Sequence, residues 1–274
     1  MVRKESSRKD KVCALLEVVA HGGKPGTLED ICAPSYLPHV PELRNVPSLA
    51  PGLAALRARL DAHGPVPNRA CRLVADGDFV FAQVRYAGET PTAGADLFRF
   101  DAAGRIAEHW NLRQEIRDEV AGGYDRYQGG GDPGAPAGEA RLARQKQKVR
   151  DLYLQLWGQG QAGRVTEFYT DTYLQHNPHI PSGSARIGQI LATDIAAYIA
   201  RERHDYPIAI HHLGSEGDLV YAWCAIYMAG LTRNEGDRSE TLDIFRVDED
   251  LRMAEHWDVL QIESVPFASH ATFY

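Results

Sequence analysis

Apolar positions in the second half of the chain follow a helical period first and a strand period afterwards. Residues 149–157 place apolar side chains at helical spacing, and glycines at 158 and 160 end the pattern. A second short helix is predicted around 165–169 and a third over 187–203. Beyond residue 210 the period changes to two. It predicts strands at 211–213, 219–228, 240–247 and 253–261. Helices followed by antiparallel strands indicate an α+β domain.

The chain also repeats its own sequence in a fixed order. The repeated pairs are 36–41 with 173–178, 77–80 with 217–220, 96–101 with 243–248, and 108–111 with 255–258, at offsets of 137, 140, 147 and 147 residues. Because the order is kept and the offset only grows, short loop insertions separate the copies. The pattern predicts two copies of one domain.

A stretch rich in glycine and proline separates the two copies. Residues 129–138 hold little that can be buried, which is typical of a flexible linker. We therefore predict an N-terminal repeat at 1–121, a linker at 122–140 and a C-terminal repeat at 141–274. A length of 274 residues suits two domains of ordinary size.

Charge and composition narrow the classes of partner. The net charge of -7 and pI of about 5.9 argue against nucleic acid. No apolar run is long enough to span a bilayer, and the charged N-terminus does not resemble a signal peptide. Four cysteines without paired spacing are typical of reduced thiols. We expect a cytoplasmic protein with a small-molecule partner, no nucleic acid and no membrane.

Segments 173–178, 217–220, 243–247 and 255–261 resemble the SnoaL-like polyketide cyclase branch of the nuclear transport factor 2-like superfamily. The resemblance covers nearly all of the second copy, and the first copy shows the same pattern less completely. It implies two tandem cone-shaped α+β barrels, each with three helices packed on a curved antiparallel sheet. The open mouth of such a cone suits a small molecule. The repeats would form an intramolecular pseudo-dimer, with a homodimer also open.

Ketosteroid isomerase, a distant member of this superfamily, uses a carboxylate base and an oxyanion hole of a tyrosine and a protonated aspartic acid. An ungapped alignment implies that Tyr153 and Asp243 take the oxyanion positions and that Asn177 takes the base position. Since asparagine cannot serve as that base, a steroid-type isomerisation by that route is disfavoured.

The last predicted strand carries the candidate acid/base pair. Alternation along 253–260 puts His256 and Asp258 on one face, which the resemblance places inward beside Asp243. We expect Asp258 and His256 to transfer protons, and Asp243 and Tyr153 to stabilise charge that develops on an oxygen atom. The simpler alternative is that His256 and Asp258 hydrogen-bond each other only to satisfy a buried polar face.

Further residues are expected to contact the substrate. His176 and Asn177 would close the rim, and aromatic side chains on an inward face would suit a flat ligand. The expected substrate-binding residues are His176, Asn177, Trp157, Tyr221, Trp223 and Phe245. The tail at 269–274 ends in two aromatic residues and is expected either to fray or to cap the mouth.

Metal and cofactor motifs are weak or missing in the sequence. His176, His179 and His256 could converge, but no HExxH or paired-cysteine spacing supports a metal site. No phosphate loop, dinucleotide fingerprint or nucleophile-elbow serine is present. We expect a site without metal or cofactor.

The two copies differ at the candidate site. The first copy has Leu16 for Tyr153, Val40 for Asn177 and Asn111 for Asp258, while it keeps His39, Asp96 and His109. Because a hydroxyl and a carboxylate are lost, we predict that the second copy houses the site. The first copy would be a structural partner or would bind a different ligand.

These patterns predict a cofactor-independent acid/base enzyme. Its substrate would be a small organic molecule, polyketide-like or another secondary metabolite, and its reaction a cyclisation, an isomerisation, or a hydration or dehydration. One alternative is an epoxide-opening cyclase or hydrolase of the same fold, for which carboxylate pairs are expected in each domain. The other is a non-catalytic metabolite-binding protein that confers resistance.

Overall fold

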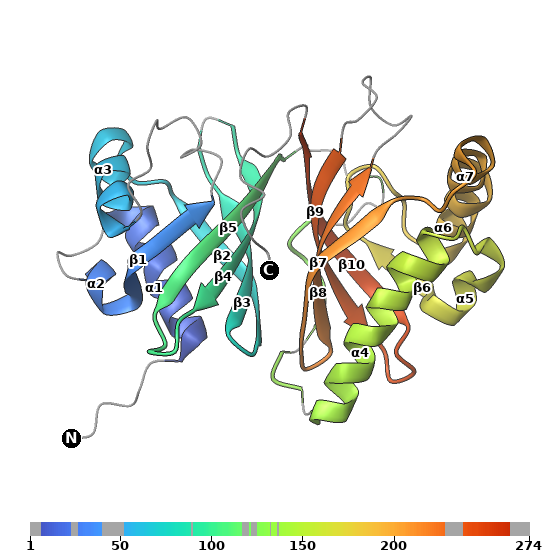
Figure 1. The fold of residues 1–274 in the computed structure, drawn as a ribbon, viewed down its shortest axis with the longest axis horizontal. Helices are drawn as coiled ribbons and strands as arrows, with labels where there is room; N and C mark the ends of the chain where they lie inside the picture. The colour runs from blue at the N-terminus through green and yellow to red at the C-terminus, as the bar shows by residue number, and fades with distance from the viewer. Residues whose placement is uncertain are drawn as a thin grey trace. The chain divides into compact units, whose positions relative to one another are not determined.

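The computed structural model describes residues 7–22, 27–39, 52–88, 90–116, 121, 125–131, 133–135, 137–227 and 238–263. The chain divides into two compact units, unit 1 at Met1–Ile116 and unit 2 at Arg117–Tyr274. In the described ranges each unit contains one five-stranded sheet with helices (Figure 1). The α+β prediction is confirmed.

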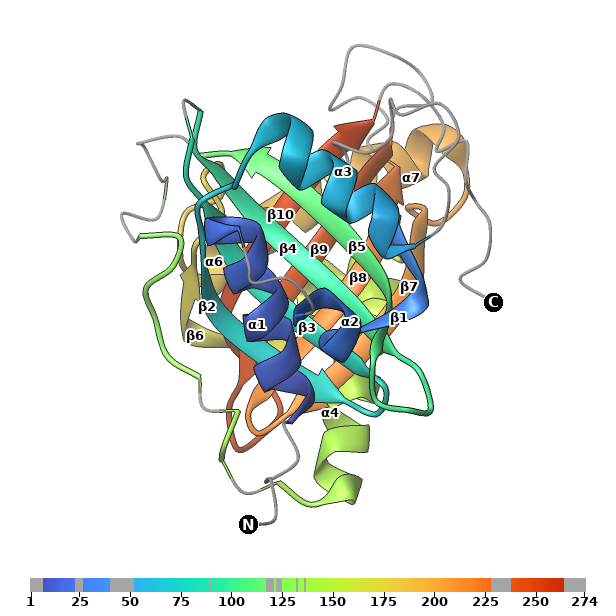
Figure 2. The same cartoon turned by 90° about the vertical axis from the view of Figure 1, so that its left-hand side faces the viewer.

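Unit 1 begins with a capped helix. The Ser7 hydroxyl accepts a hydrogen bond from the Asp10 backbone N–H, and the Asp10 carboxylate returns one. The elements are α1 (Arg8–His21), α2 (Thr27–Ile31), β1 (Cys32–His39), α3 (Leu53–His63), β2 (Asn68–Asp76), β3 (Phe79–Tyr86), β4 (Thr92–Phe100) and β5 (Ile106–Glu115). The strand order is β1-β5-β4-β3-β2, with β1 parallel to β5. The three helices lie across one face of this sheet (Figure 2).

Unit 2 repeats this order as β6-β10-β9-β8-β7, with β6 parallel to β10. Its helical elements are α4 (Glu139–Asp151), η2 (Leu152–Trp157), η3 (Ala162–Arg164), α5 (Val165–Phe168), α6 (Ser184–Ile190), η4 (Leu191–Ile195) and α7 (Ala196–Glu202). Its strands are β6 (Tyr169–Gln175), β7 (Ile208–Glu216), β8 (Leu219–Tyr227), β9 (Arg238–Val247) and β10 (Met253–Glu263). The shared order is consistent with two tandem domains, and their origin by duplication stays a prediction.

The predicted helices and four strands of unit 2 are present, with two differences. Tyr169, expected at the end of a helix, begins the fifth strand β6, which periodicity did not indicate. The edge pair of β6 and β10 is parallel, so the sheet is not antiparallel throughout. Both differences arise because β6 is short and takes its position from β10.

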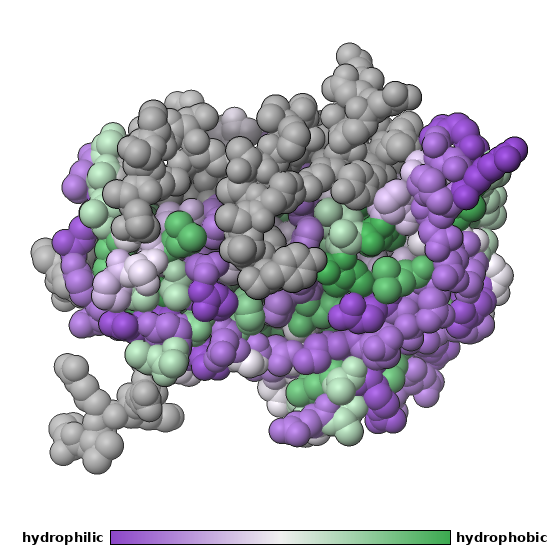
Figure 3. All heavy atoms as spheres, in the orientation of Figure 1, coloured by the Kyte–Doolittle hydropathy of each residue, from purple (hydrophilic) through white to green (hydrophobic). Residues whose placement is uncertain are grey.

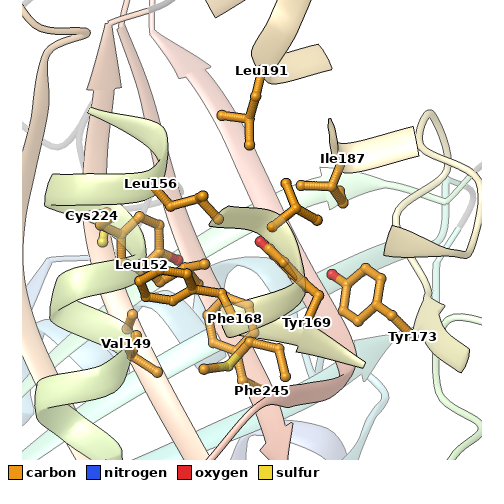
Figure 4. Close-up of a cluster of buried hydrophobic side chains, with 14 of the residues drawn as sticks. Val149, Leu152, Leu156, Phe168, Tyr169, Tyr173, Ile187, Leu191, Cys224 and Phe245 are labelled. Carbon is orange, nitrogen blue, oxygen red and sulfur yellow. The ribbon is translucent and has the colours of Figure 1, made fainter. Parts of the chain in front are cut away.

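The apolar core of unit 2 lies between its helices and one face of its sheet, here called the inner face. Val149, Leu152 and Leu156 point from α4 and η2 toward Phe168 and Phe245 (Figure 4). Val220, Ala222 and Cys224 supply the β8 side of the same core. Burying each large apolar side chain contributes on the order of 1.5–3 kcal/mol.

The helices cover this core with a polar exterior. The side of unit 2 that carries α5 and α7 is mainly hydrophilic (Figure 3). Among the described side chains, Leu154 is the large hydrophobic residue that is exposed. In the part of the chain that the structure describes, no helix has the length and apolar character needed to cross a membrane.

The segment predicted as a flexible linker makes specific contacts with the opposite, outer face of the unit 2 sheet. The Gly130 N–H donates to the Glu255 carboxylate at 3.0 Å, and Trp257 Nε1 donates to the Gln128 carbonyl at 2.8 Å. Gly129 has a φ of 112°, and a Cβ there would collide with Glu255 and Trp257. The glycines therefore allow a close backbone approach, which composition alone does not distinguish from flexibility.

Candidate functional site

The register of β9 and β10 places the predicted polar residues together on the inner face. Asp243 lies opposite Asp258, and His256 lies opposite Phe245. On β8, Ala222 lies opposite Asp243 and belongs to the apolar core. Since directly opposed residues share a face, the two carboxyl groups and the imidazole all face the helices.

Asp243 receives hydrogen bonds from three side chains. The Tyr153 hydroxyl donates to Oδ2 at 2.6 Å, and the Thr241 hydroxyl donates to the same oxygen at 3.1 Å. His256 Nε2 lies 2.9 Å from Oδ1. Tyr153 comes from the π-helical turn η2, a feature that is frequent at functional sites. Burial, with the nearby charge of Asp243, raises the pKa of Tyr153 well above its ordinary value, so its hydroxyl stays protonated.

Gln175 fixes the orientation of His256. His256 Nδ1 lies 2.8 Å from Gln175 Oε1, which also accepts the Asn177 backbone N–H. Because an amide oxygen only accepts, Nδ1 must carry a proton. The other ring nitrogen is thereby directed at Asp243. Sequence analysis missed Gln175, because the first copy has Pro38 at that position and offers no comparison.

The surroundings of the His256 imidazole favour its charged form. Burial lowers the pKa of His256, but the hydrogen bond with Asp243 and the charges of Asp243 and Asp258 outweigh it, so the pKa is raised. The ring also stacks on Phe245, with centroids 4.5 Å apart. His256 bonds to Asp243 and Gln175 and not to Asp258, so the simple pairing considered from the sequence is not formed.

Asp258 has one oxygen available. Asn177 Nδ2 donates to Oδ2, whereas Oδ1 is buried without a hydrogen-bond partner. Burial raises the pKa of Asp258 and the Asp243 charge acts in the same direction, more strongly than His256, Asn177 and Arg126 lower it. The residue is 5% exposed. An orphaned buried carboxyl oxygen is rare in folded proteins and needs an explanation.

The same residues form the donor set that a cation would use. Within the described ranges, Asp243, His256 and Asp258 offer ligand atoms within 4.8 Å of one another. His256 Nε2 and Asp243 Oδ1 already lie at hydrogen-bond distance, 2.9 Å. A metal ion would have to replace that bond, so the geometry fits a hydrogen-bonded cluster better.

Tyr221 and Trp223 do not lie on the expected inner face, and His176, which was expected at the rim, also contacts the outer face. Tyr221 and Trp223 alternate with the core residues of β8 and so lie on the outer face, where Tyr221 stacks on His212 and Trp223 donates to Glu240. His176 bonds Glu255 at 2.9 Å and stacks on Trp257, both also on the outer face.

These errors have a physical reason. Both faces of β8 are apolar, so period-two alternation does not show which one meets the helices. His176 lies just beyond the end of β6, where strand alternation no longer applies.

The other predicted contacts lie at the cluster or in the core. Asn177 bonds Asp258, and Phe245 contacts both Tyr153 and His256. Trp157 is half-buried against the apolar core and donates to the Tyr169 hydroxyl at 3.1 Å. Their contact with a substrate stays a prediction.

The corresponding position in unit 1 is filled. Asp96 is 0% exposed and accepts hydrogen bonds from the Tyr86 hydroxyl at 3.0 Å and from Asn111 Nδ2 at 2.9 Å. His109 Nε2 lies 2.6 Å from the same carboxyl group. Val40, the counterpart of Asn177, lies outside the described residues. Both oxygens of Asp96 therefore have a hydrogen-bond partner.

Arg126 is a second residue that sequence analysis missed. It belongs to the glycine-rich segment and is 4% exposed. Burial lowers the pKa of Arg126, and the negative charge of Asp258 opposes that shift. An isolated arginine in a stretch that indicates a linker gives no signal of burial.

Comparisons with known proteins agree with this fold. The family model of the SnoaL-like domain matches residues 149–256. Wild-type IdmH of Streptomyces antibioticus, proposed to be a polyketide cyclase, is 19% identical over 39% of this chain and 91% of its own, with a TM-score of 0.32. TsrD of Streptomyces laurentii is 19% identical over 46% and 92%, with a TM-score of 0.35. The comparison with curated proteins found no match.

Proposed function

Because residues 149–256 of the chain carry a SnoaL-like domain, we propose that unit 2 is a cofactor-independent proton-transfer site of the cyclase and isomerase type. Its substrate is a small organic molecule of polyketide-like chemistry. The observation that supports the proposal most is the unpartnered Oδ1 of Asp258 beside a completed polar network. Fold alone does not determine function, so the proposal depends on these residues.

Asp258 is the group that moves the proton. Its Oδ1 takes a proton from a carbon next to a substrate carbonyl, so the C–H bond breaks, an O–H bond forms, and the electron pair moves to the carbonyl oxygen. Return of the proton to another carbon completes an isomerisation. Alternatively, the enolate carbon attacks a second carbonyl to close a ring, and the proton passes from Asp258 to the alkoxide oxygen that this attack creates. The raised pKa of Asp258, caused mainly by burial, makes the carboxylate a stronger base than an exposed aspartate.

The carboxyl group of Asp258 lies beside a hydrogen-bonded network of Tyr153, Asp243, His256 and Gln175. In this network the polar side-chain atoms of Tyr153, Asp243 and His256 bond to other members. Asp243 is an acceptor for all three of its partners, which supports an ionised carboxylate rather than the donor expected from the resemblance. The positive His256 next to it favours negative charge at Asp258 and on the substrate.

Proton exchange at carbon tests this function without the natural substrate. Ethyl 2-methylacetoacetate in D₂O reports exchange of its acidic proton by NMR. We expect the wild-type protein to accelerate exchange and Asp258→Asn to lose about 10²- to 10⁴-fold of the acceleration. Retention of exchange by that variant would refute the role of Asp258.

Epoxide opening is a second candidate, favoured by one observation. Asp243 and Asp258 are directly opposed on neighbouring strands, which gives unit 2 the carboxylate pair that such enzymes are expected to use. Conversion of styrene oxide to its diol, with no exchange of the keto ester, would favour this candidate over proton transfer at carbon.

A further inference from the structure

Proton removal from carbon leaves a negative charge on a substrate oxygen, and that charge needs a donor or a cation. The following inference rests on the function proposed above. Tyr153 and Asp243 were the expected stabilising groups. The Tyr153 hydroxyl donates to Asp243, however, and Asp243 accepts from three partners. The stabilising group must therefore come from another part of unit 2.

Arg126 is a buried cation that could stabilise negative charge on a substrate oxygen. It is 4% exposed although it lies in neither the sheet nor a helix. An arginine keeps its charge even when buried, and its planar guanidinium matches carboxylate and enolate oxygens. A buried permanent charge persists only where the surroundings compensate it.

Hydrogen bonds on both sides of Arg126 fix the backbone that carries it. On one side, His176 Nδ1 donates to the Asp125 carbonyl at 2.6 Å. On the other, Trp257 Nε1 donates to the Gln128 carbonyl at 2.8 Å. His176 and Trp257 stack on each other, with ring centroids 5.0 Å apart, so the two anchors form one support. His176 is followed by Asn177, whose side-chain amide donates to Asp258 Oδ2, and Trp257 directly precedes Asp258. Both anchors of the Arg126 backbone are therefore one residue away from that carboxyl group or its hydrogen-bond partner.

The charges around Asp258 favour an anionic ligand. Asp243 and the positive His256 compensate each other at 2.9 Å. The charges of Asp258 and Arg126 act on each other's pKa, although burial is the larger cause for both groups. When Asp258 takes up a proton, its negative charge disappears from beside Arg126. An anionic oxygen on the substrate restores the balance within range of the same guanidinium.

We propose that Arg126 forms an anion subsite beside Asp258, and that it binds the enolate oxygen of the reacting substrate or a carboxylate carried by it. Proton transfer then moves negative charge from Asp258 to the substrate oxygen, and the charge stays close to the Arg126 guanidinium throughout. The glycine-rich segment that precedes α4 is therefore a functional part of unit 2. Its glycines bring the backbone close enough to the sheet to place Arg126 there.

Binding of two anionic probes to the full-length protein tests the subsite. 4-Nitrophenolate represents an enolate and benzoate represents a carboxylate, while nitrobenzene is the neutral control. We expect Arg126→Gln to weaken binding of at least one anion by about tenfold or more, and Arg126→Lys to weaken it less. Arg186→Gln removes a charge from the exposed surface of unit 2 and should leave affinity unchanged.

The variant Asp258→Asn separates this subsite from the proposed function. It should lose proton exchange yet bind the anion as tightly as the wild type or more tightly, because a neighbouring negative charge is gone. Loss of exchange in Asp258→Asn together with unchanged anion affinity in Arg126→Gln would overturn the subsite alone. Anion binding that depends on Arg126, with exchange retained in Asp258→Asn, would overturn the proposed function alone.

Two further outcomes decide the proposal. If the wild-type protein binds neither anion more tightly than nitrobenzene, the subsite is refuted. If Arg126→Gln does not fold, as circular dichroism would show, Arg126→Lys becomes the deciding variant, because it keeps the charge and removes the planar guanidinium. Preference for the phenolate over benzoate in the wild type would assign the subsite to the enolate.

Discussion

The two units place an aspartate and a histidine on the same strands but complete their hydrogen bonds differently. In unit 1, Tyr86, His109 and Asn111 converge on Asp96, so that both of its oxygens have a partner. In unit 2 a second carboxyl group, Asp258, stands where unit 1 has Asn111, and one of its oxygens has no partner. The completeness of hydrogen bonding, more than residue type, separates a structural cluster from a candidate site.

The tyrosine hydroxyl also comes from different elements in the two units. In unit 2 it comes from the π-helical turn, as Tyr153. Unit 1 has Leu16 at that position and supplies Tyr86 from β3 instead. Gly94 permits this, since a Cβ there would collide with the Tyr86 ring. A hydroxyl that is missing at residue 16 is therefore supplied from the sheet.

A second cluster of repeated residues lies on the outer faces. Glu255 of unit 2 accepts from Arg246 at 3.0 Å and bonds His176 at 2.9 Å. Glu108 of unit 1 pairs with Arg99 and lies 3.6 Å from His39. Because both units keep this arrangement, we interpret it as a structural feature of the fold.

Removing the imidazole should give the largest difference between the two units in the rate of proton exchange. His256→Ala takes away the positive partner of Asp243 and should slow exchange of the keto ester by about 10²-fold or more. His109→Ala in unit 1 is the matched control and should leave exchange unchanged while it lowers the melting temperature. Equal losses of exchange would mean that both units act.

Asn111→Asp in unit 1 and Asp258→Asn in unit 2 should have different effects on the free energy of unfolding. Asn111→Asp puts two oxygens at the 2.9 Å contact with Asp96 and should cost about 1–3 kcal/mol in urea unfolding at pH 7. Asp258→Asn should cost nothing or stabilise slightly. The raised pKa of Asp258, due to burial, means that its contribution is present at low pH and is lost as pH rises through that pKa. A large loss in Asp258→Asn would show that it is a packing group.

Removing each tyrosine hydroxyl should give a smaller, similar cost in both units. Tyr153→Phe and Tyr86→Phe each delete a donor to a buried carboxylate, so we expect about 1–2 kcal/mol in each case. Only Tyr153→Phe should also slow exchange, because only its carboxylate borders the orphaned oxygen. A slower rate in Tyr86→Phe with intact folding would contradict this assignment.

The smallest expected effect is a shift in the pH dependence of the exchange rate. Burial raises the pKa of Asp258, so exchange should rise with pH through a limb above the ordinary aspartate value of about 3.9. Arg126→Gln should move that limb to higher pH, because Arg126 lowers the pKa of Asp258. A limb that stays in place would argue against proximity of the two groups.

Much of the fold and part of the cluster could be predicted from the sequence. Period-two alternation correctly joined His256 and Asp258 on one face, because they are two residues apart in a regular strand. It did not identify the partner of His256, since Asp243 meets it only through the register of two strands. Tyr221 and Trp223 were misplaced because both faces of β8 are apolar.

The remaining residues depend on contacts that local patterns do not encode. Gln175 acts at the end of a short parallel strand that periodicity did not indicate. Arg126 lies in a segment whose glycines indicate flexibility but instead permit close packing against Glu255 and Trp257. Finding either residue requires the position of β10 relative to the rest of unit 2.

The central claim is that unit 2 transfers protons through Asp258 while unit 1 keeps an equivalent cluster for structure. The direct test compares Asp258→Asn with Asp96→Asn in exchange of the keto ester, at equal concentration of folded protein. We predict that Asp258→Asn loses about 10²- to 10⁴-fold of the acceleration and that Asp96→Asn retains the wild-type rate. Full activity in Asp258→Asn, or an equal loss in both variants, would contradict the account.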